Sequence, residues 1–196
     1  MVENHYDFIN VHHHNSNREL EEILKELGRD ASNIIEVCGE KVYLPSSNLH
    51  ALFLLKHAIS HFAAAEITLR QLLDWAFFVK EYHRQIDWEW LEKTLERFGM
   101  RQLYNLFNAI YVDDLGFEPK IFSRVQFKPY MKESVLIEIL SSKYSNDLPS
   151  GFIRRIIYKL RRWKANGWKQ QLCYKESRWE AFWSGVWAHI IKPSTI

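Results

Sequence analysis

Residues 44–74 carry the clearest helical pattern of the chain and read LPSSNLHALFLLKHAISHFAAAEITLRQLLD. After a polar start, apolar residues recur at the three- and four-residue spacings of a helix. His50, His57 and His61 follow at intervals of seven and four, so a helix places the three imidazoles on one line, here named the histidine stripe. A second helix follows at once and carries Asp74 among apolar neighbours. The sequence therefore predicts a helix pair in which the stripe faces a nearly buried Asp74.

Three interpretations of the histidine stripe are open from the sequence. Histidines four residues apart, such as His57 and His61, are a workable ligand pair for a metal ion, although this spacing alone is a weak signal. The second interpretation is a polar ligand pocket, and the third is a structural role in which the imidazoles hydrogen-bond to Asp74 or to the backbone. Lys56, one position away from the stripe, is either a solvated charge or a contact for a phosphate group.

Helical periodicity extends over most of the remaining sequence. The 7 glycines and 5 prolines are few for 196 residues, which favours long helices over a many-turned β fold. Besides the helix at 47–64, helices are expected at 16–28, 67–83, 87–98, 100–115, 131–142, 152–164 and 179–191. Ser16, in a capping box with Glu19, and Asp87 are the expected N-caps of two of these helices.

A small β portion is expected before residue 45. Residues 2–9 alternate like a strand, and 34–38 and 41–44 flank Gly39-Glu40, which suits a two-residue hairpin turn. One strand and one hairpin cannot form a stable sheet alone, so these residues either pack on the helices or complete a sheet supplied by something else. The predicted fold class is mainly α, a helical bundle-like domain with a small N-terminal β remnant of one strand plus a hairpin.

The charge of the chain changes sign along its length. Residues 1–149 hold 16 Lys and Arg against 22 Asp and Glu, a net charge of −6, whereas residues 150–196 hold 10 against 2, a net charge of +8. We distinguish three segments on this basis and on the helical pattern. They are an α/β remnant at 1–44, a helical domain at 45–145 and a basic, aromatic-rich helical tail at 146–196 packed on the body.

Between residues 154 and 169 the tail interleaves basic and aromatic residues. This composition suits nucleic acid or an anionic membrane surface as a partner. The alternative is that these residues bind no partner and form a solvated helix face whose aromatic rings pack on the body. We expect the aromatic helix at 179–191 to pack on the helical body and the basic residues of 154–169 to stay exposed.

Several classes of protein are disfavoured by composition. No apolar run reaches the roughly 18 residues that a membrane-spanning helix needs, and the first residues do not resemble a secretory signal. Cys38 and Cys173 are too isolated for a disulfide framework or a cysteine metal site. A reducing cytoplasm is therefore the expected location.

Four segments resemble a known family, namely VENHY at 2–6, LPSSNLHALFLLKHAISHF at 44–62, LRQLLDWA at 69–76 and IDWEWL at 86–91. Through them the whole chain resembles the C-terminal portion of a bacterial, uncharacterised nucleotidyltransferase-like family in the polymerase-β-like nucleotidyltransferase group. Proteins of this kind join an α/β catalytic part to a helical part. The resemblance implies a catalytic part with a Gly-Ser turn, an Asp-x-Asp pair and a third acid, whose carboxylates hold Mg²⁺ on a triphosphate.

The sequence departs from that pattern at the catalytic elements. It contains no Gly-Ser dipeptide and no Asp-x-Asp tripeptide, and Glu3 is the residue that best matches the third acid and metal ligand. The resemblance thus implies a truncated form or one half of a split gene. Such a chain is the C-terminal helical half of a nucleotidyltransferase-like protein, inactive alone, and it uses Mg²⁺ only when a catalytic N-terminal half completes it.

The resemblance also implies roles for the histidine helix. In a complete protein this helix lines one wall of a nucleotide cleft, where His57, His61 and Asp74 shape the wall and Lys56 meets phosphate. The main rival hypothesis is a non-enzymatic helical binding module that uses the basic residues of 154–169 on nucleic acid or an anionic surface.

Overall fold

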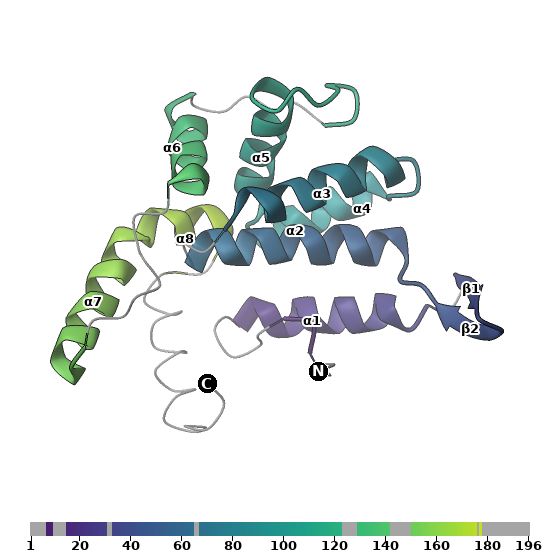
Figure 1. The fold of residues 1–196 in the computed structure, drawn as a ribbon, viewed down its shortest axis with the longest axis horizontal. Helices are drawn as coiled ribbons and strands as arrows, with labels where there is room; N and C mark the ends of the chain where they lie inside the picture. Colours follow the sequence, from purple (N-terminus) through teal and green to yellow (C-terminus); the bar gives the residue numbers. More distant parts are fainter. Residues whose placement is uncertain are drawn as a thin grey trace.

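The computed structural model describes residues 7–9, 15–30, 33–64, 67–122, 129–141, 150–175 and 177, and helices dominate them (Figure 1). In chain order the elements are α1 (Asn15–Gly28), β1 (Ile34–Val37), β2 (Glu40–Tyr43), α2 (Ser47–Ala64), α3 (Leu69–Tyr82), α4 (Trp88–Arg97), α5 (Arg101–Asp113), α6 (Pro129–Leu140), α7 (Phe152–Ala165) and α8 (Gly167–Cys173). The predicted mainly α fold class is confirmed. The helix expected at 179–191 lies outside the described residues, as does the strand expected at 2–9 except for residues 7–9, which are not in a strand.

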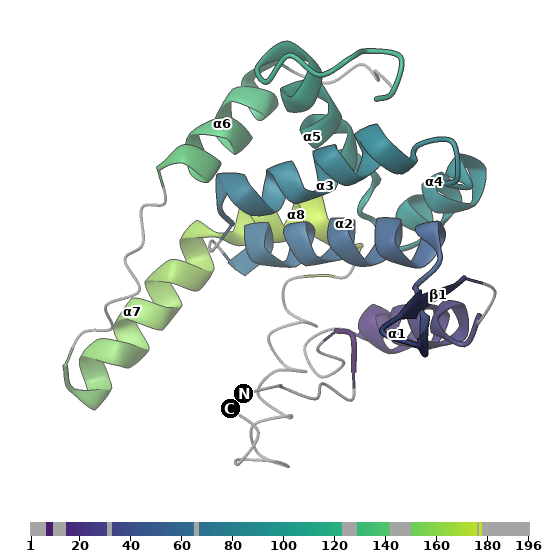
Figure 2. The ribbon, with the colours of Figure 1, turned by 45° about the vertical axis from the view of Figure 1, so that its right-hand side comes forward.

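The core is built around α2, which packs against α1, α3 and α8 (Figures 1 and 2). Because α2 has neighbours on several sides, apolar residues cover most of its circumference, and Leu52, Leu55 and Phe62 are fully buried. The ring of Phe62 meets Phe107 of α5 edge-on, with 6.2 Å between ring centres. Trp75 of α3 is also fully buried, so the two helices that carry the candidate site rest on a packed interior.

Of the two N-caps predicted from the sequence, Asp87 of α4 is confirmed and Ser16 of α1 is not. Asp87 caps α4 by accepting a hydrogen bond from the backbone N–H of Trp90 at 3.0 Å, as predicted. The prediction that Ser16 is an N-cap is wrong, because α1 begins one residue earlier and includes Ser16. The carboxylate of Glu19 forms an ion pair with Arg97 of α4, which joins the two helices.

The β1–β2 hairpin projects beyond the end of α1, and all eight of its strand residues are exposed (Figure 1). Its turn is formed by Cys38 and Gly39, one residue earlier than predicted. Both turn residues have positive φ angles, 54° and 85°, which suit the type I′ turn that joins two twisted strands. The predicted hairpin is therefore confirmed, but the idea that its strands pack on the helices is wrong.

One face of the hairpin is mainly aliphatic. The strands pair antiparallel with Ile35 opposite Val42 and Glu36 opposite Lys41, and directly paired residues share a face. Glu36 and Lys41 therefore share one face, which also carries Ile34 and Tyr43. The opposite face, here named the apolar hairpin face, carries Ile35, Val37, Val42 and Leu44, whose exposed fractions are 40–47%, and Glu40, which pairs with Val37 beside the turn, is its one charged member.

A charged pair lies inside the protein between α6 and α8. Lys169 is only 1% exposed, and its ammonium forms an ion pair with Glu138, although the contact is not aligned as a hydrogen bond. The ammonium also lies 5.7 Å from the ring centre of Phe62. Burial lowers the pKa of Lys169, and Glu138 opposes this shift. The prediction that the basic residues of 154–169 stay exposed is therefore wrong for Lys169, and α8 itself was not predicted.

The helix α7 extends away from the rest of the described structure (Figures 1 and 2). Its residues Arg154, Arg155, Arg161 and Lys164 are exposed, in agreement with the sequence-based expectation for them. Of the helices in the described part of the chain, none has the length and apolar character needed to cross a bilayer.

Candidate functional site

The histidine stripe lies along α2 as its spacing predicts, but its members have different surroundings. The His57 ring contacts His61 at 4.4 Å between ring centres and stacks on Phe53 at 5.9 Å. The His50 ring instead meets Phe78 of α3 edge-on at 5.4 Å. The stripe is therefore a pair of neighbouring imidazoles plus a third that is tied to an aromatic ring.

Lys56 lies in the interior and not beside the stripe. Its side chain is 1% exposed, and its ammonium lies 3.4 Å from the hydroxyl oxygen of Tyr174 and 4.6 Å from the centre of that ring. Successive side chains on a helix diverge by about 100°, so His57 can face solvent while Lys56 faces inward. The interpretation of Lys56 as a solvated charge is wrong. A contact with phosphate would require the ammonium to leave the protein interior.

Asp74 is exposed, so the prediction that it is nearly buried is wrong. The neighbouring Trp75 takes the buried position instead. Within the described residues, no hydrogen bond or ion pair joins Asp74 to an imidazole. The two groups are nevertheless close enough for Asp74 to act electrostatically on His57.

The pKa of His57 is lowered from its ordinary value. The largest cause is partial desolvation of the ring, which packs against Phe53 and His61, and the charge of protonated His61 adds to it. Asp74 acts in the opposite direction, because its carboxylate favours the charged imidazolium. The imidazole of His57 is therefore kept neutral to lower pH than a free histidine.

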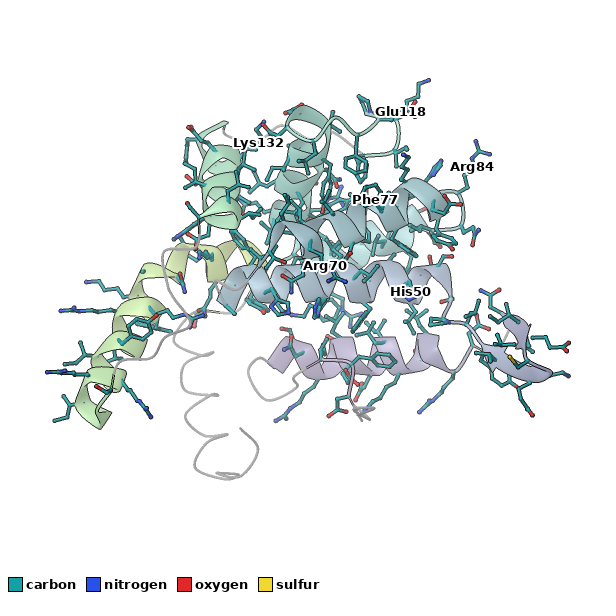
Figure 3. All side chains as sticks on the ribbon, viewed as in Figure 1. His50, Arg70, Phe77, Arg84, Glu118 and Lys132 are labelled. Carbon is teal, nitrogen blue, oxygen red and sulfur yellow. The ribbon has the colours of Figure 1, made fainter. Side chains whose placement is uncertain are left out.

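Arg70 belongs to the same surface, although it was not among the site residues predicted from the sequence. The contact of His50 with Phe78 and the proximity of His57 to Asp74 show that α2 and α3 run antiparallel. Continuing that alignment by one helical turn places Arg70 opposite His61. Figure 3 shows Arg70 where α3 lies over α2. The four-residue spacing between Arg70 and Asp74 was the sequence signal that could have identified it.

We name the surface formed by His57, His61, Arg70 and Asp74 the α2–α3 face. Arg70 is exposed and, among the described residues, has no ion-pair partner. His57, His61 and Asp74 therefore lie close together at the surface, and the alignment of the helices brings the guanidinium of Arg70 to the same side. Such a set can donate to anionic oxygens through the guanidinium and accept hydrogen bonds through the carboxylate.

Within the described residues, no group of three or more His, Cys, Asp and Glu side chains is arranged to hold a metal ion. The stripe therefore gains no support as a metal site. Glu3, the predicted third acid and metal ligand, lies outside the described residues.

Lowering the pH from about 7.5 to 5.5 should destabilise the protein partly through His57. Its lowered pKa means that the unfolded chain takes up a proton more readily, so stability is full above about 6.5 and falls as the pH drops below it. Glutamine does not titrate, so we expect His57→Gln to reduce this loss. The reduction should be only a few tenths of a kcal/mol, because solvent screens the His57 side chain. Urea unfolding at both pH values measures it. His83→Gln, outside the stripe, is the control, and an unchanged pH dependence in His57→Gln would contradict the assignment.

A sequence model described as Uncharacterised nucleotidyltransferase matches residues 1–112. The match covers more than half of the chain and runs from its start through α1, the hairpin, α2, α3 and α4 into α5. The chain belongs to the uncharacterised nucleotidyltransferase family. No curated protein and no solved structure shows a significant match to this chain.

Membership of the uncharacterised nucleotidyltransferase family confirms the resemblance seen in the sequence at the level of the family. The α2–α3 face lies wholly within the matched residues, as does the apolar hairpin face. Both are therefore features of the family-matched part, whereas α6, α7 and α8 follow it. A bacterial source and a position in the C-terminal portion of a longer protein stay predictions.

Proposed function

We propose that this member of the nucleotidyltransferase family is the helical half of a nucleotidyltransferase-like protein and is inactive alone. The catalytic α/β half, with the Gly-Ser turn and the Asp-x-Asp pair, is supplied by a separate segment or chain. The observation that carries the proposal is the apolar hairpin face, which lies inside the family-matched residues and yet is exposed. The lack of both catalytic motifs in the sequence supports it.

The hairpin has the properties of an element that completes a larger sheet. A two-stranded hairpin is at best marginally stable in water, and its two edges offer unpaired backbone groups to another strand. Its four exposed aliphatic side chains present on the order of 300 Å², well below the ~800 Å² that each partner buries in a typical stable complex. Contact between two hairpins is therefore too small to hold two copies of this chain. An adjoining sheet would add backbone hydrogen bonds to the apolar contact.

In the completed protein the α2–α3 face forms one wall of the nucleotide cleft. The planar guanidinium of Arg70 suits phosphate oxygens, because it can donate two parallel hydrogen bonds. His57 and His61 contribute ring nitrogens that can hydrogen-bond to a ligand, and Asp74 can accept hydrogen bonds from hydroxyl groups. Arg70 takes the phosphate-binding role that the sequence suggested for Lys56, since Lys56 faces inward.

Mg²⁺ belongs to the catalytic half in this proposal. The described residues of this chain do not fit a metal site by themselves. Glu3 is the residue that the chain would add to the carboxylates of the catalytic half. The contribution of the helical half is therefore to bind and orient the nucleotide.

The chain alone should show no nucleotide transfer, and it should gain activity with a catalytic half. Without the paired carboxylates, the charge that develops during phosphoryl transfer is not stabilised. The assay uses the four nucleoside triphosphates with Mg²⁺ or Mn²⁺, first on the chain alone. It is then repeated after co-production with the Gly-Ser- and Asp-x-Asp-bearing segment encoded upstream of Met1. Activity of the chain alone that disappears in Glu3→Ala would contradict the proposal, as would the lack of any such segment in the genome.

A matched pair of variants tests the role of the hairpin in that complex. Ile35→Lys places a charge on the apolar hairpin face, whereas Ile34→Lys changes a neighbour of similar exposure, 48% against 42%, on the opposite face. We expect Ile35→Lys to weaken the association with the catalytic half at least tenfold, and Ile34→Lys to have little effect. Sedimentation velocity measures both. Equal effects of the two variants would show that the apolar hairpin face does not dock the catalytic half.

A further inference from the structure

One side of α7 exposes an aliphatic row. Ile153, Ile157 and Leu160 are 71%, 46% and 49% exposed, and their spacing of four and three places them on one line of the helix. The family-matched residues end before this helix, so the proposed nucleotide cleft does not account for it. An aliphatic row of this kind on an outward-projecting helix is a contact surface (Figures 1 and 2).

Basic side chains border the row. Arg154 and Arg161 each follow an aliphatic member of the row by one position, and Lys164 continues the line one turn after Leu160. All three basic side chains are exposed. The surrounding segment is strongly basic, because residues 150–196 hold 10 Lys and Arg against 2 Asp and Glu. The partner of this surface therefore carries negative charge beside an apolar layer.

We propose that α7 binds the surface of an anionic lipid membrane. The aliphatic row enters the boundary between headgroups and acyl chains, while Arg154, Arg161 and Lys164 contact lipid phosphates. The helix has 14 residues, a length of about 21 Å, so it lies in the plane of the membrane surface and does not cross it. A nucleic acid would pair with the basic side chains but would leave the aliphatic row in water.

The binding holds one side of the helical body at the membrane and does not depend on nucleotide transfer. The opposite side of α7 at its C-terminal end is tied to the body, because the guanidinium of Arg162 donates to the carbonyl oxygen of Ala64 at the end of α2. This contact joins the end of α7 to the end of α2, and the outer row lies on the other side of α7. Binding through α7 therefore brings the helical body, with its α2–α3 face, to the lipid surface.

Vesicle co-sedimentation of the full chain tests the proposal. Vesicles of phosphatidylcholine with about 30% phosphatidylglycerol should bind the chain, and pure phosphatidylcholine vesicles should bind it at least tenfold more weakly. Raising the salt concentration should weaken the binding, because exposed charges are screened. The double substitution Ile153→Ser and Ile157→Ser should lower the partition coefficient about fivefold or more, since apolar area no longer enters the lipid.

The matched control is Ile137→Ser with Leu140→Ser on α6, two aliphatic residues of comparable exposure at 50% and 64%. This variant should bind vesicles like the unchanged chain, and both variants should keep the melting temperature because the positions are exposed. Equal binding by the two variants would overturn the proposal. So would tight binding to duplex DNA that Arg154→Gln and Arg161→Gln abolish while the serine substitutions do not, because that result identifies a nucleic-acid surface.

Discussion

Glu138→Gln is expected to lower the free energy of unfolding by about 3 kcal/mol at neutral pH. Glu138 is the counter-charge of Lys169, whose side chain is 1% exposed, and glutamine leaves that ammonium buried without a carboxylate. The nearby ring of Phe62 attracts the cation but does not replace a full negative charge. Urea unfolding followed by circular dichroism measures the loss.

The pH dependence of this loss separates the buried charge from simple repacking. The pKa of Lys169 is already lowered by burial, and removing Glu138 lowers it further, so the unfolded chain binds the proton more readily. Stability of Glu138→Gln should therefore recover as the pH rises toward 10.5, the ordinary pKa of lysine, because the buried ammonium gives up its proton below that pH. Glu133→Gln, at an exposed position of the same helix, is the control and should change stability by less than about 0.5 kcal/mol. A deficit in Glu138→Gln that does not shrink with rising pH would exclude the buried charge as its cause.

Helical periodicity predicted the main elements because it depends on the order of nearby residues alone. The range 47–64 expected for the histidine helix is the range of α2, and Asp87 caps α4 as expected. Side-chain burial was harder to predict. Lys56 faces inward, where its ammonium meets Tyr174. Tyr174 lies 118 residues further along the chain, so a local sequence pattern could not reveal this contact. Asp74 stands next to the buried Trp75, yet it is exposed because neighbours on a helix point in different directions.

The candidate site was predicted in part for the same reason. His57 and His61 were expected together and lie 4.4 Å apart, since a spacing of four fixes their relation on one helix. The addition of Arg70 depends on how α3 aligns against α2, and that alignment is a tertiary property. The exposure of the hairpin could likewise not be predicted from the sequence. The alternation of residues in a strand predicts which residues share a face but not what covers that face.

The second large effect is expected at Gly99, which follows α4. Gly99→Ala should lower the free energy of unfolding by about 3 kcal/mol or more, whereas Gly116→Ala should cost about 1 kcal/mol. Both glycines have positive φ angles, 74° and 72°, so alanine meets similar backbone strain at either position. They differ in space, because a Cβ at Gly99 would lie 2.5 Å from the backbone nitrogen of Lys175, and one at Gly116 would have no neighbour within 4 Å.

The excess cost at Gly99 measures how firmly the end of α8 is held against the end of α4. A backbone atom cannot rotate aside like the tip of a side chain, so relief requires the chain at Lys175 to move. Such a move would disturb the preceding Tyr174, whose hydroxyl and ring contact the ammonium of Lys56. Gly99→Ala should therefore also speed hydrogen exchange of the α8 amides, while Gly116→Ala leaves them protected. Equal destabilisation by the two alanines would mean that the contact at Lys175 yields freely and that α8 is not fixed by it.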